Sequence, residues 1–208
     1  MSEYMGTEVI KVNPTNPERV FLKWAADILR DGGLVAFPTE TVYGLGANYL
    51  DAGALERLYA VKSRPSNKPF TVHIADIDVP RALSCEISPR AKAIIDKFWP
   101  GPLTLVLAAG NGKNIGFRMP RNRLALEFIT LCGVPVVAPS ANLSGNVPPR
   151  NCADVLKDLD GRIDLVLDGG QTEVGVESTV CDISGESVRI LREGAIPAEE
   201  IMGALNQI

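Results

Sequence analysis

Residues 16–41 read NPERVFLKWAADILRDGGLVAFPTET, which places a helix, a turn and a buried strand in direct succession. Asn16-Pro17 is typical of a helix N-terminus, and apolar residues recur at helical spacing from Val20 to Leu29. Gly32-Gly33 ends the helix. Leu34–Phe37 then forms a short apolar run of the kind found in buried strands. A helix followed at once by a buried strand predicts an α/β fold.

The same alternation of apolar strands and capped helices continues along the chain. Further strands are expected at residues 70–74, 103–108, 115–119, 135–138, 163–167, 178–183 and 187–191. Further helices are expected to begin at Asp51, Ser88, Leu124, Asn151 and Pro197. Because some strands follow one another directly, the sheet is expected to be mixed. We therefore predict a single α/β domain over residues 1–208, with a twisted mixed sheet flanked by helices.

Length and composition exclude several classes of protein. The chain has 208 residues, of which 46% are hydrophobic and 22% charged, as in soluble globular proteins and unlike disordered or collagen-like chains. No apolar run approaches the roughly 20 residues that cross a bilayer, and residues 1–13 lack a signal-peptide pattern. The expected location is the cytoplasm, with no membrane partner.

The cysteines and the one histidine argue against a metal centre. Cys85, Cys132, Cys152 and Cys181 form no C-x-x-C pair, which argues against a zinc ribbon or a thioredoxin-type site. His73 is the only histidine, so zinc motifs with two histidines are excluded. We expect no metal site within the protein and interpret the cysteines as inert core residues.

Positive charge is concentrated in two segments that contain no acidic residue. Residues 57–75 and 97–126 carry 9 of the 21 lysines and arginines and none of the 25 aspartates and glutamates. The remaining residues carry 12 basic and 25 acidic side chains, a net charge of −13. This segregation favours an anionic ligand, either a nucleotide or a nucleic acid, although two solvated surface segments would give the same count.

Two glycine-rich stretches lack the spacing of phosphate-binding loops. Residues 44–49 (GLGANY) end in Tyr49 where a dinucleotide-binding fingerprint requires glycine. Residues 110–114 (GNGKN) lack the P-loop spacing. Neither a Rossmann site nor a Walker site is supported, and there is no G-x-S-x-G nucleophile elbow.

Polar loops at the ends of strands and helices are better candidates for a ligand site. Arg64 offers a planar fork for a phosphate or carboxylate, while Lys62 and Lys68 would act as mobile point charges. Positively charged residues at a helix C-terminus could equally serve only to stabilise the helix dipole. For the other candidates, two roles likewise stay open: contact with a ligand, or an ordinary structural role in a turn or in the core. These candidates are Thr39-Glu40-Thr41, His73, Ser140 with Asn142, and Glu177-Ser178-Thr179.

Taken in order, these segments resemble the family of YrdC-type L-threonylcarbamoyladenylate synthases. The motifs that carry the resemblance are PTETVYGL (38–45), KSRP (62–65) with Lys68-Pro69, VHI (72–74), WPGPLT (99–104), RMP (118–120), PSAN (139–142) and GVEST (175–179). The similarity runs from Gly32 to Gly194, and the combination of Lys-x-Arg with Ser-x-Asn in this order is specific. It implies a YrdC-like fold with a basic concave surface.

The resemblance also implies an activity and a set of site residues. L-threonine, bicarbonate and ATP would be joined into threonylcarbamoyl-AMP with release of pyrophosphate, and a separate threonylcarbamoyl transferase would use the product to modify tRNA. Family positions that hold L-threonine correspond to Thr41, His73, Arg118, Ala138 and Ser178. Those that hold ATP correspond to Arg64, Lys68, Asn114, Ser140, Asn142 and Arg192. Lys62 and Arg64 would be the catalytic residues.

The implied chemistry suits these residue types. A carbamate oxygen must attack the α-phosphorus of ATP, so two anions must meet, and catalysis depends mainly on positioning and charge neutralisation. Lys62 and Arg64 would offset phosphate charge, and Arg118 would bind the substrate carboxylate. Mg²⁺ is expected to arrive with ATP, because the motifs contain no carboxylate cage for it.

Several alternatives stay open. Some relatives carry an extra C-terminal domain that closes over the site, so a lid here is expected from the chain's own loops or from a partner. Asn114 stands where some relatives have threonine. A paralogue that handles another carbamoyl adenylate, or a non-catalytic module that binds tRNA or double-stranded RNA, would share the basic surface. The low aromatic content of 6% favours the enzyme, because single-strand binders rely on aromatic stacking.

Overall fold

Ten strands form one mixed sheet in the part of the chain that the computed structural model describes, residues 6–65, 69–110 and 112–205. In their spatial order the strands are β1 (Glu8–Lys11), β8 (Leu165–Asp168), β2 (Val35–Pro38), β3 (Tyr43–Asn48), β7 (Val136–Val137), β4 (Val72–His73), β6 (Asn114–Arg118), β5 (Leu103–Ala108), β9 (Thr179–Asp182) and β10 (Arg189–Arg192). The pairs β1–β8, β8–β2, β4–β6 and β5–β9 are parallel and the others antiparallel. The predicted mixed sheet is confirmed.

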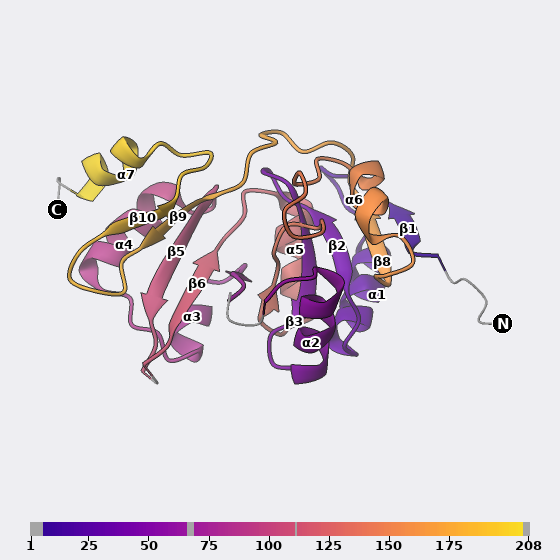
Figure 1. Cartoon of the computed structure of the whole chain (residues 1–208), viewed down its shortest axis with the longest axis horizontal. Coiled ribbons are helices and arrows are strands. Elements are labelled where there is room, and N and C mark those ends of the chain that lie inside the picture. Colours follow the sequence, from indigo (N-terminus) through magenta and orange to yellow (C-terminus); the bar gives the residue numbers. More distant parts are fainter. Residues whose placement is uncertain (1–5, 66–68, 111, 206–208) are drawn as a thin grey trace.

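Helices flank this sheet and enclose two apolar cores (Figure 1). Within the described residues the helices are α1 (Arg19–Arg30), α2 (Ala52–Val61), α3 (Val79–Ala82), α4 (Pro89–Phe98), α5 (Arg123–Cys132), α6 (Cys152–Leu159) and α7 (Ala198–Leu205). Residues of α1 and α5 belong to the smaller core, and residues of α2, α4, α6 and α7 belong to the larger one. Across these described ranges, no helix is both long and apolar enough to cross a membrane.

The strand predicted after Gly33 lies between the two cores. All four residues of β2 are buried. Val35 and Phe37 belong to the core under α1 and α5, whereas Ala36 belongs to the larger core. Because successive side chains of a strand point to opposite faces, a strand covered on both faces has to be apolar throughout. This requirement explains the uninterrupted run that marked the α/β fold in the sequence.

The glycine-rich stretch at residues 44–48 forms most of β3, a strand that the sequence pattern did not predict. β3 pairs antiparallel with β2, with Gly44 opposite Phe37 and Gly46 opposite Val35. A Cβ atom at Gly46 would lie 3.1 Å from the Phe37 ring and 3.2 Å from the Leu29 side chain. The glycine therefore allows α1 and Phe37 to approach the strand closely.

The first helix begins later than the sequence predicted. α1 starts at Arg19, and the predicted cap at Asn16 is wrong. The side-chain oxygen of Asn13 accepts hydrogen bonds from the backbone N–H groups of Thr15 and Asn16, so residues before the helix form a turn. β1 and α3 were also not predicted. The strand expected at 70–74 is reduced to β4, only two residues long.

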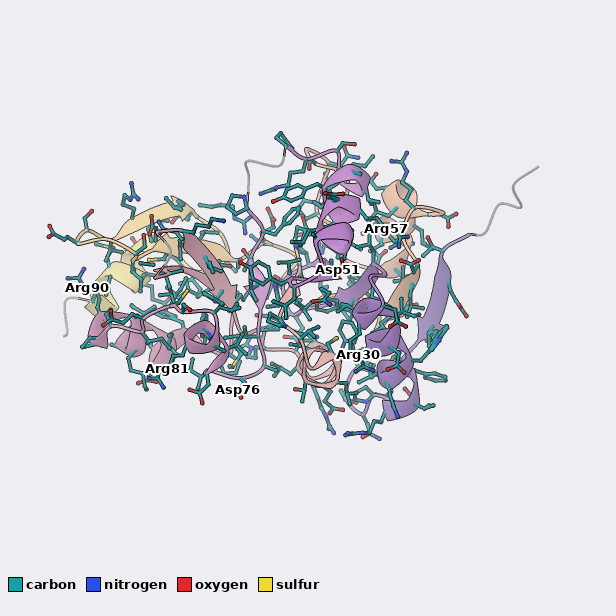
Figure 2. The ribbon with its side chains drawn as sticks, turned by 90° about the horizontal axis from the view of Figure 1, so that it is seen from below. Arg30, Asp51, Arg57, Asp76, Arg81 and Arg90 are labelled. Carbon is teal, nitrogen blue, oxygen red and sulfur yellow. The ribbon has the colours of Figure 1, made fainter. Side chains whose placement is uncertain are left out.

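Three other helix caps are confirmed. Asp51, labelled at the start of α2 in Figure 2, accepts hydrogen bonds from the backbone N–H groups of Gly53 and Ala54. Ser88 caps α4 and Asn151 caps α6 through the same type of bond. A capping side chain satisfies backbone donors that have no partner within the helix, which explains why this signal is readable from sequence.

The interpretation of the cysteines as core residues is also confirmed. All four lie in the described part of the chain, where they are buried and form no disulfide. Burial raises the pKa of Cys132 to about 12 and the pKa values of Cys152 and Cys181 to about 11. At neutral pH these groups are therefore thiols, the less reactive form.

Replacement of Gly46 by alanine should destabilise the fold, because the new methyl group would press on Phe37, Leu29 and the Val35 carbonyl oxygen. We expect the free energy of unfolding to fall by about 1–3 kcal/mol in chemical denaturation. Gly185→Ala is the matched control, since a Cβ atom there meets nothing within 4 Å. Its effect should stay within about 0.5 kcal/mol, and equal effects of the two variants would contradict the packing argument.

Candidate functional site

A cleft with two connected compartments lies where the loops after β2 and β7 meet strands β4, β5 and β6. We call the deeper part the inner compartment, and it holds about 590 Å³ of non-atom space, partly open to solvent. Only about 110 Å³ of this space is cavity volume, which is below the range usual for drug-sized ligands and suits a compact ligand. Its polar and charged lining comes from Thr39, Arg64, Thr71, His73, Thr104, Arg118, Ser140, Glu177, Ser178 and Arg192.

A second space, the outer compartment, adjoins the inner one. It is lined by Lys62, Arg64, Pro65, Ser140, Asn142, Ser144, Gly145, Asn146, Pro148, Glu177 and Arg192. Arg64, Ser140, Glu177 and Arg192 line both compartments and therefore mark the boundary between them. A ligand in each compartment could meet the other at this boundary.

Ser140 is held at the boundary by β3. The backbone N–H of Leu45 donates to the Pro139 carbonyl oxygen over 2.7 Å, and the N–H of Ala141 donates to the Tyr43 carbonyl oxygen over 2.8 Å. Gly44 and Ser140 form an antiparallel bridge between these two bonds. The loop after β7 thus continues the sheet pairing, which fixes the backbone that carries the Ser140 hydroxyl.

Arg118, the last residue of β6, is buried beside a carboxylate. Its Nη2 lies 3.0 Å from Oε1 of Glu40 and donates to Oγ1 of Thr41 over 2.8 Å. The Thr39 hydroxyl donates to the Val42 carbonyl oxygen, so the short contact between Thr41 and Thr39 has Thr41 as the donor. Burial lowers the pKa of Arg118, and Glu40 opposes this shift. The guanidinium stays charged at neutral pH and is held in one orientation.

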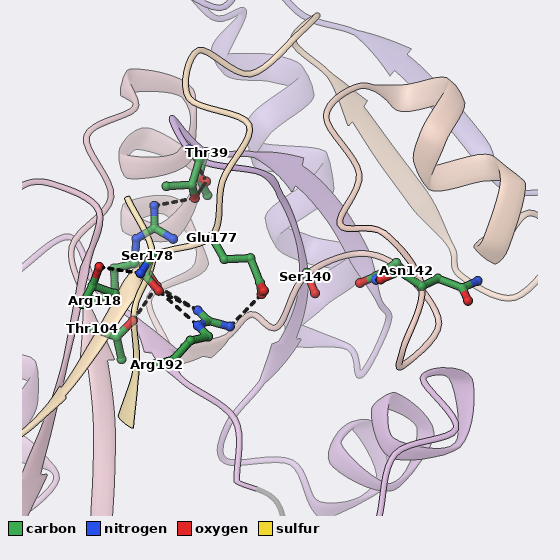
Figure 3. Close-up of polar contacts among 12 residues, drawn as sticks. Thr39, Thr104, Arg118, Ser140, Asn142, Glu177, Ser178 and Arg192 are labelled. Atoms are coloured by element: carbon green, nitrogen blue, oxygen red, sulfur yellow. Dashed lines mark hydrogen bonds and ion pairs between the residues drawn. The ribbon is translucent and has the colours of Figure 1, made fainter. Parts of the chain in front are cut away.

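Arg192 and the loop before β9 form a second charged cluster (Figure 3). Nε and Nη2 of Arg192 donate to the Ser178 carbonyl oxygen, and Nη1 lies 2.8 Å from Oε1 of Glu177. The Ser178 hydroxyl lies 2.9 Å from the Thr104 hydroxyl on β5. Arg192 therefore fixes the loop that brings Ser178 into the inner compartment.

Lys62 is buried, so the expectation of a mobile point charge is wrong for this residue. Its side chain lies at the C-terminal end of α2 with a residue exposure of 2%. Nζ donates to the carbonyl oxygens of Ser140 and Asn142 over 2.5 and 2.6 Å. Burial, together with the charge of Arg64, lowers the pKa of Lys62 to about 8. Lys62 thus ties α2 to the Ser-x-Asn loop while contributing to the lining of the outer compartment.

His73 is a buried, neutral imidazole in the wall of the inner compartment. Its ring packs edge to face against the Phe37 ring, with 6.4 Å between the ring centroids. Its Nδ1 is buried with no hydrogen-bond partner in the described structure. Burial and the nearby charge of Arg118 lower the pKa of His73 to about 3. At neutral pH the ring therefore adds no charge to the compartment.

The two groups of predicted site residues overlap at the boundary, because Arg64, Ser140 and Arg192 line both compartments. Of the residues assigned to L-threonine, His73, Arg118, Ala138 and Ser178 line the inner compartment, while Thr41 lies outside its lining and binds Arg118. Of those assigned to ATP, the residues that line the outer compartment are Arg64, Ser140, Asn142 and Arg192.

Two residues assigned to ATP are not brought to these compartments. Asn114, the first residue of β6, donates from Nδ2 to the Ser184 hydroxyl over 2.9 Å and lines neither compartment. Its place in an ATP site therefore has no support from this geometry. Lys68 lies outside the described residues.

Some residues of the cleft had no ligand assigned to them in the sequence analysis: Thr39, Glu40 and Glu177 were open candidates, and Thr104 was not a candidate. Glu40, Thr39, Thr104 and Glu177 contact or line the site through the bonds described above. Thr39 and Glu40 had a readable signal, because polar residues directly after a fully buried strand require buried partners. Thr104 had none, because a threonine inside a strand is ordinary.

The charge of the cleft differs from the simple sequence count. The acid-free segments supply Lys62, Arg64 and Arg118, but Glu40 from elsewhere in the chain is paired with Arg118. Across residues 6–65, 69–110 and 112–205, no group of three or more His, Cys, Asp or Glu side chains is placed to hold a metal ion. The arrangement can bind a small polar molecule in the inner compartment and an anion in the outer one.

The fold and the cleft define an α/β protein with a polar cleft in two adjoining parts. The family profile Sua5_yciO_yrdC, described as telomere recombination, matches residues 27–194, and the chain belongs to this family. It is 43% identical over 196 residues to the threonylcarbamoyl-AMP synthase of Pyrococcus abyssi, covering 90% of this chain and 58% of that protein. It is also 43% identical over 194 residues to the synthase of Bacillus subtilis, covering 88% of this chain and 56% of that protein.

A solved structure extends the comparison. The crystal structure of P. abyssi Sua5 complexed with L-threonine matches with a TM-score of 0.92 and 41% identity, covering 97% of this chain and 62% of that one. The chain thus spans a little over half the length of these relatives. The resemblance inferred from the motifs and the YrdC-like fold are both confirmed.

The imidazole of His73 should remain neutral well below the usual histidine range. As His73 is the only histidine, its C2-proton NMR signal is unambiguous in the untagged protein, and we expect no titration between pH 8 and 5. From about pH 6.5 down to about 3, only the unfolded chain takes up this proton, so the free energy of unfolding should fall with decreasing pH. The contribution is up to about 1.4 kcal/mol per pH unit, and His73→Gln should lack it. A titration midpoint between pH 6 and 7 would contradict the buried, uncharged state.

Proposed function

We propose that the protein is a threonylcarbamoyl-AMP synthase that uses L-threonine, bicarbonate and ATP. The observation that carries this proposal is the meeting of the two compartments at Arg64, Ser140, Glu177 and Arg192. A reaction that joins an amino acid to a nucleotide requires two adjoining sites of different polarity. The names of the P. abyssi and B. subtilis relatives support the same activity.

L-threonine would bind in the inner compartment. The Arg118 guanidinium offers charge-assisted hydrogen bonds to a carboxylate, and its orientation is fixed by Glu40 and Thr41. The hydroxyls of Thr104 and Ser178 provide donors and acceptors for a substrate hydroxyl. The complex of the P. abyssi relative with L-threonine supports an amino-acid ligand.

ATP would bind in the outer compartment with its α-phosphate at the boundary. Lys62 and Arg64 supply positive charge there, and Ser140 and Asn142 supply a hydroxyl and an amide. Lys68 and Asn114 remain proposed ATP residues only through the family resemblance. Mg²⁺ bound to ATP would supply further charge neutralisation on the phosphates. No carboxylate cage for Mg²⁺ exists among the residues lining the described outer compartment, so the triphosphate and water would hold the ion.

The reaction places defined demands on the boundary residues. The nitrogen of L-threonine and bicarbonate form a carbamate with loss of water. A carbamate oxygen then attacks the α-phosphorus, the bond between that phosphorus and the bridging oxygen to the β-phosphate breaks, and pyrophosphate leaves. Arg64 lies at the boundary, where it can offset the charge of the attacked phosphate. Lys62 holds the Ser140 backbone in place during the attack.

The proposed product is a mixed anhydride that requires a second protein. A separate threonylcarbamoyl transferase would take it up and modify adenosine in tRNA, and the cytoplasm is the proposed location. Direct contact with tRNA or double-stranded RNA is not required for the synthase step. The RNA-binding module is the weaker alternative, since the positive charge of Arg118 is buried against Glu40 and would not face an RNA backbone.

The proposed activity predicts pyrophosphate release that depends on L-threonine. The purified chain is incubated with ATP, Mg²⁺ and bicarbonate, and pyrophosphate and the adenylate are measured with and without L-threonine. L-valine is the matched control, because it has the shape of L-threonine without the hydroxyl. A site that hydrogen-bonds that hydroxyl should discriminate strongly against valine. Pyrophosphate release at the same rate without L-threonine would exclude the proposal.

Lys62→Met should impair the ATP half of the site more than the L-threonine half. The variant removes the bonds that hold the carbonyl oxygens of Ser140 and Asn142. We expect kcat/KM for ATP to fall by the equivalent of about 1.5–3 kcal/mol of transition-state stabilisation. L-threonine should still shift the His73 NMR signal. Lys157→Met is the control, because its amine is exposed on α6 and pairs only with Asp154 among the described residues. An unchanged kcat/KM for ATP in Lys62→Met would refute the anchoring role.

A further inference from the structure

Glu40 is a fully buried carboxylate for which the proposed chemistry has no direct use. Its exposed fraction is 0%, and neither of its carboxylate oxygens has a hydrogen-bond partner in the described structure. Its charge is compensated by Arg118, whose Nη2 lies 3.0 Å from Oε1. Burying a carboxylate costs free energy even when it is paired, so the position of Glu40 beside the site requires an explanation.

Glu40 lies behind the inner compartment, whereas Arg118 lines it. The other guanidinium near Arg118, that of Arg192, is likewise paired with a carboxylate, Glu177, at 2.8 Å. The guanidinium groups of Arg118 and Arg192 are therefore each paired with a carboxylate, and His73 is neutral. These two ion pairs add no net charge to the inner compartment, and the third arginine of its lining, Arg64, lies at the boundary with the outer compartment.

The outer compartment is built differently. The Lys62 ammonium is bonded to carbonyl oxygens, which carry no formal charge, so its positive charge is not cancelled by its hydrogen-bond acceptors. Arg64 also donates to a carbonyl oxygen, that of Pro69, over 3.2 Å. Arg118 and Arg192 are thus each paired with a carboxylate, whereas Lys62 is bonded to carbonyl oxygens.

We propose that Glu40 determines the ligand selectivity of the inner compartment, which admits a zwitterionic amino acid and rejects phosphate anions because Glu40 balances the charge of Arg118. This proposal rests on the proposed function. A zwitterion brings no net charge into a balanced pocket, whereas a phosphate group brings an excess negative charge that only an uncompensated guanidinium would stabilise. With Glu40 present, L-threonine and the phosphates of ATP do not compete for Arg118. Glu40 acts through Arg118 and is a positioning and selectivity residue, not a catalytic one.

The proposal is tested by competition between L-threonine and inorganic pyrophosphate. The His73 NMR signal reports on the inner compartment, because His73 lines it and is the only histidine. In the wild-type protein, L-threonine should shift this signal and millimolar pyrophosphate should not displace it. In Glu40→Gln, pyrophosphate should itself shift the signal and weaken L-threonine binding about tenfold or more, as expected for a newly uncompensated guanidinium.

Two control variants separate local charge from other effects. Glu40→Asp keeps the charge and should restore exclusion of pyrophosphate. Glu173→Gln removes one negative charge at an exposed position of the loop before Ser178 and should behave as wild type. A loss of stability alone would weaken L-threonine binding in Glu40→Gln without creating a pyrophosphate site, so a gain of anion binding cannot come from misfolding.

Each outcome decides the question. Pyrophosphate that competes with L-threonine in the wild-type protein would overturn the selectivity role, even if Glu40→Gln fails to fold. A folded Glu40→Gln variant that gains no pyrophosphate binding would overturn it as well. Both results leave L-threonine binding intact and so leave the proposed function standing. Absence of any L-threonine binding to the wild-type protein would instead overturn the proposed function and, with it, this inference.

Discussion

The antiparallel pairing of β2 with β3 is the constraint on which the site depends. β2 must be apolar on both faces because a core lies on each side of it, and the chain reverses immediately after it. The reversal places Glu40 and Thr41 in the interior, where Arg118 pairs with the Glu40 carboxylate and donates to the Thr41 hydroxyl. β3 then carries the loop that contains Ser140 through two short backbone bonds. The turn between β2 and β3 therefore positions both the residues behind the inner compartment and the residues at its boundary with the outer compartment.

The local parts of this architecture were readable from the sequence. Caps at Asp51, Ser88 and Asn151 depend on residues only two or three positions apart, and the strand after Gly33 depends on its own apolar run. β3 was missed because its glycines suggested a loop, whereas they are required by the close approach of Phe37 and Leu29. β1 was missed because two of its four residues are charged and it is largely exposed.

The partners of the charged residues could not be derived from sequence patterns. Glu40 and Arg118 are 78 positions apart, and Lys62 reaches carbonyl oxygens of equally distant residues. A basic residue at the end of a helix is usually solvated, so local reasoning placed Lys62 on the surface. The family resemblance named the cations of the cleft, but it did not reveal that Arg118 and Arg192 are paired with carboxylates whereas Lys62 is bonded to carbonyl oxygens. That division depends on which acceptors the fold brings to each cation.

The anchoring of Lys62 has a consequence for how the protein responds to alkaline conditions. Its pKa of about 8 means that mild alkali converts the ammonium into an amine. A neutral amine still has two hydrogens, enough for the carbonyl oxygens of Ser140 and Asn142. Deprotonation would therefore leave the loop in place while removing one positive charge from the space lined by Arg64 and Asn142. Structural support and electrostatic attraction, supplied by one nitrogen atom, become separable simply by titration.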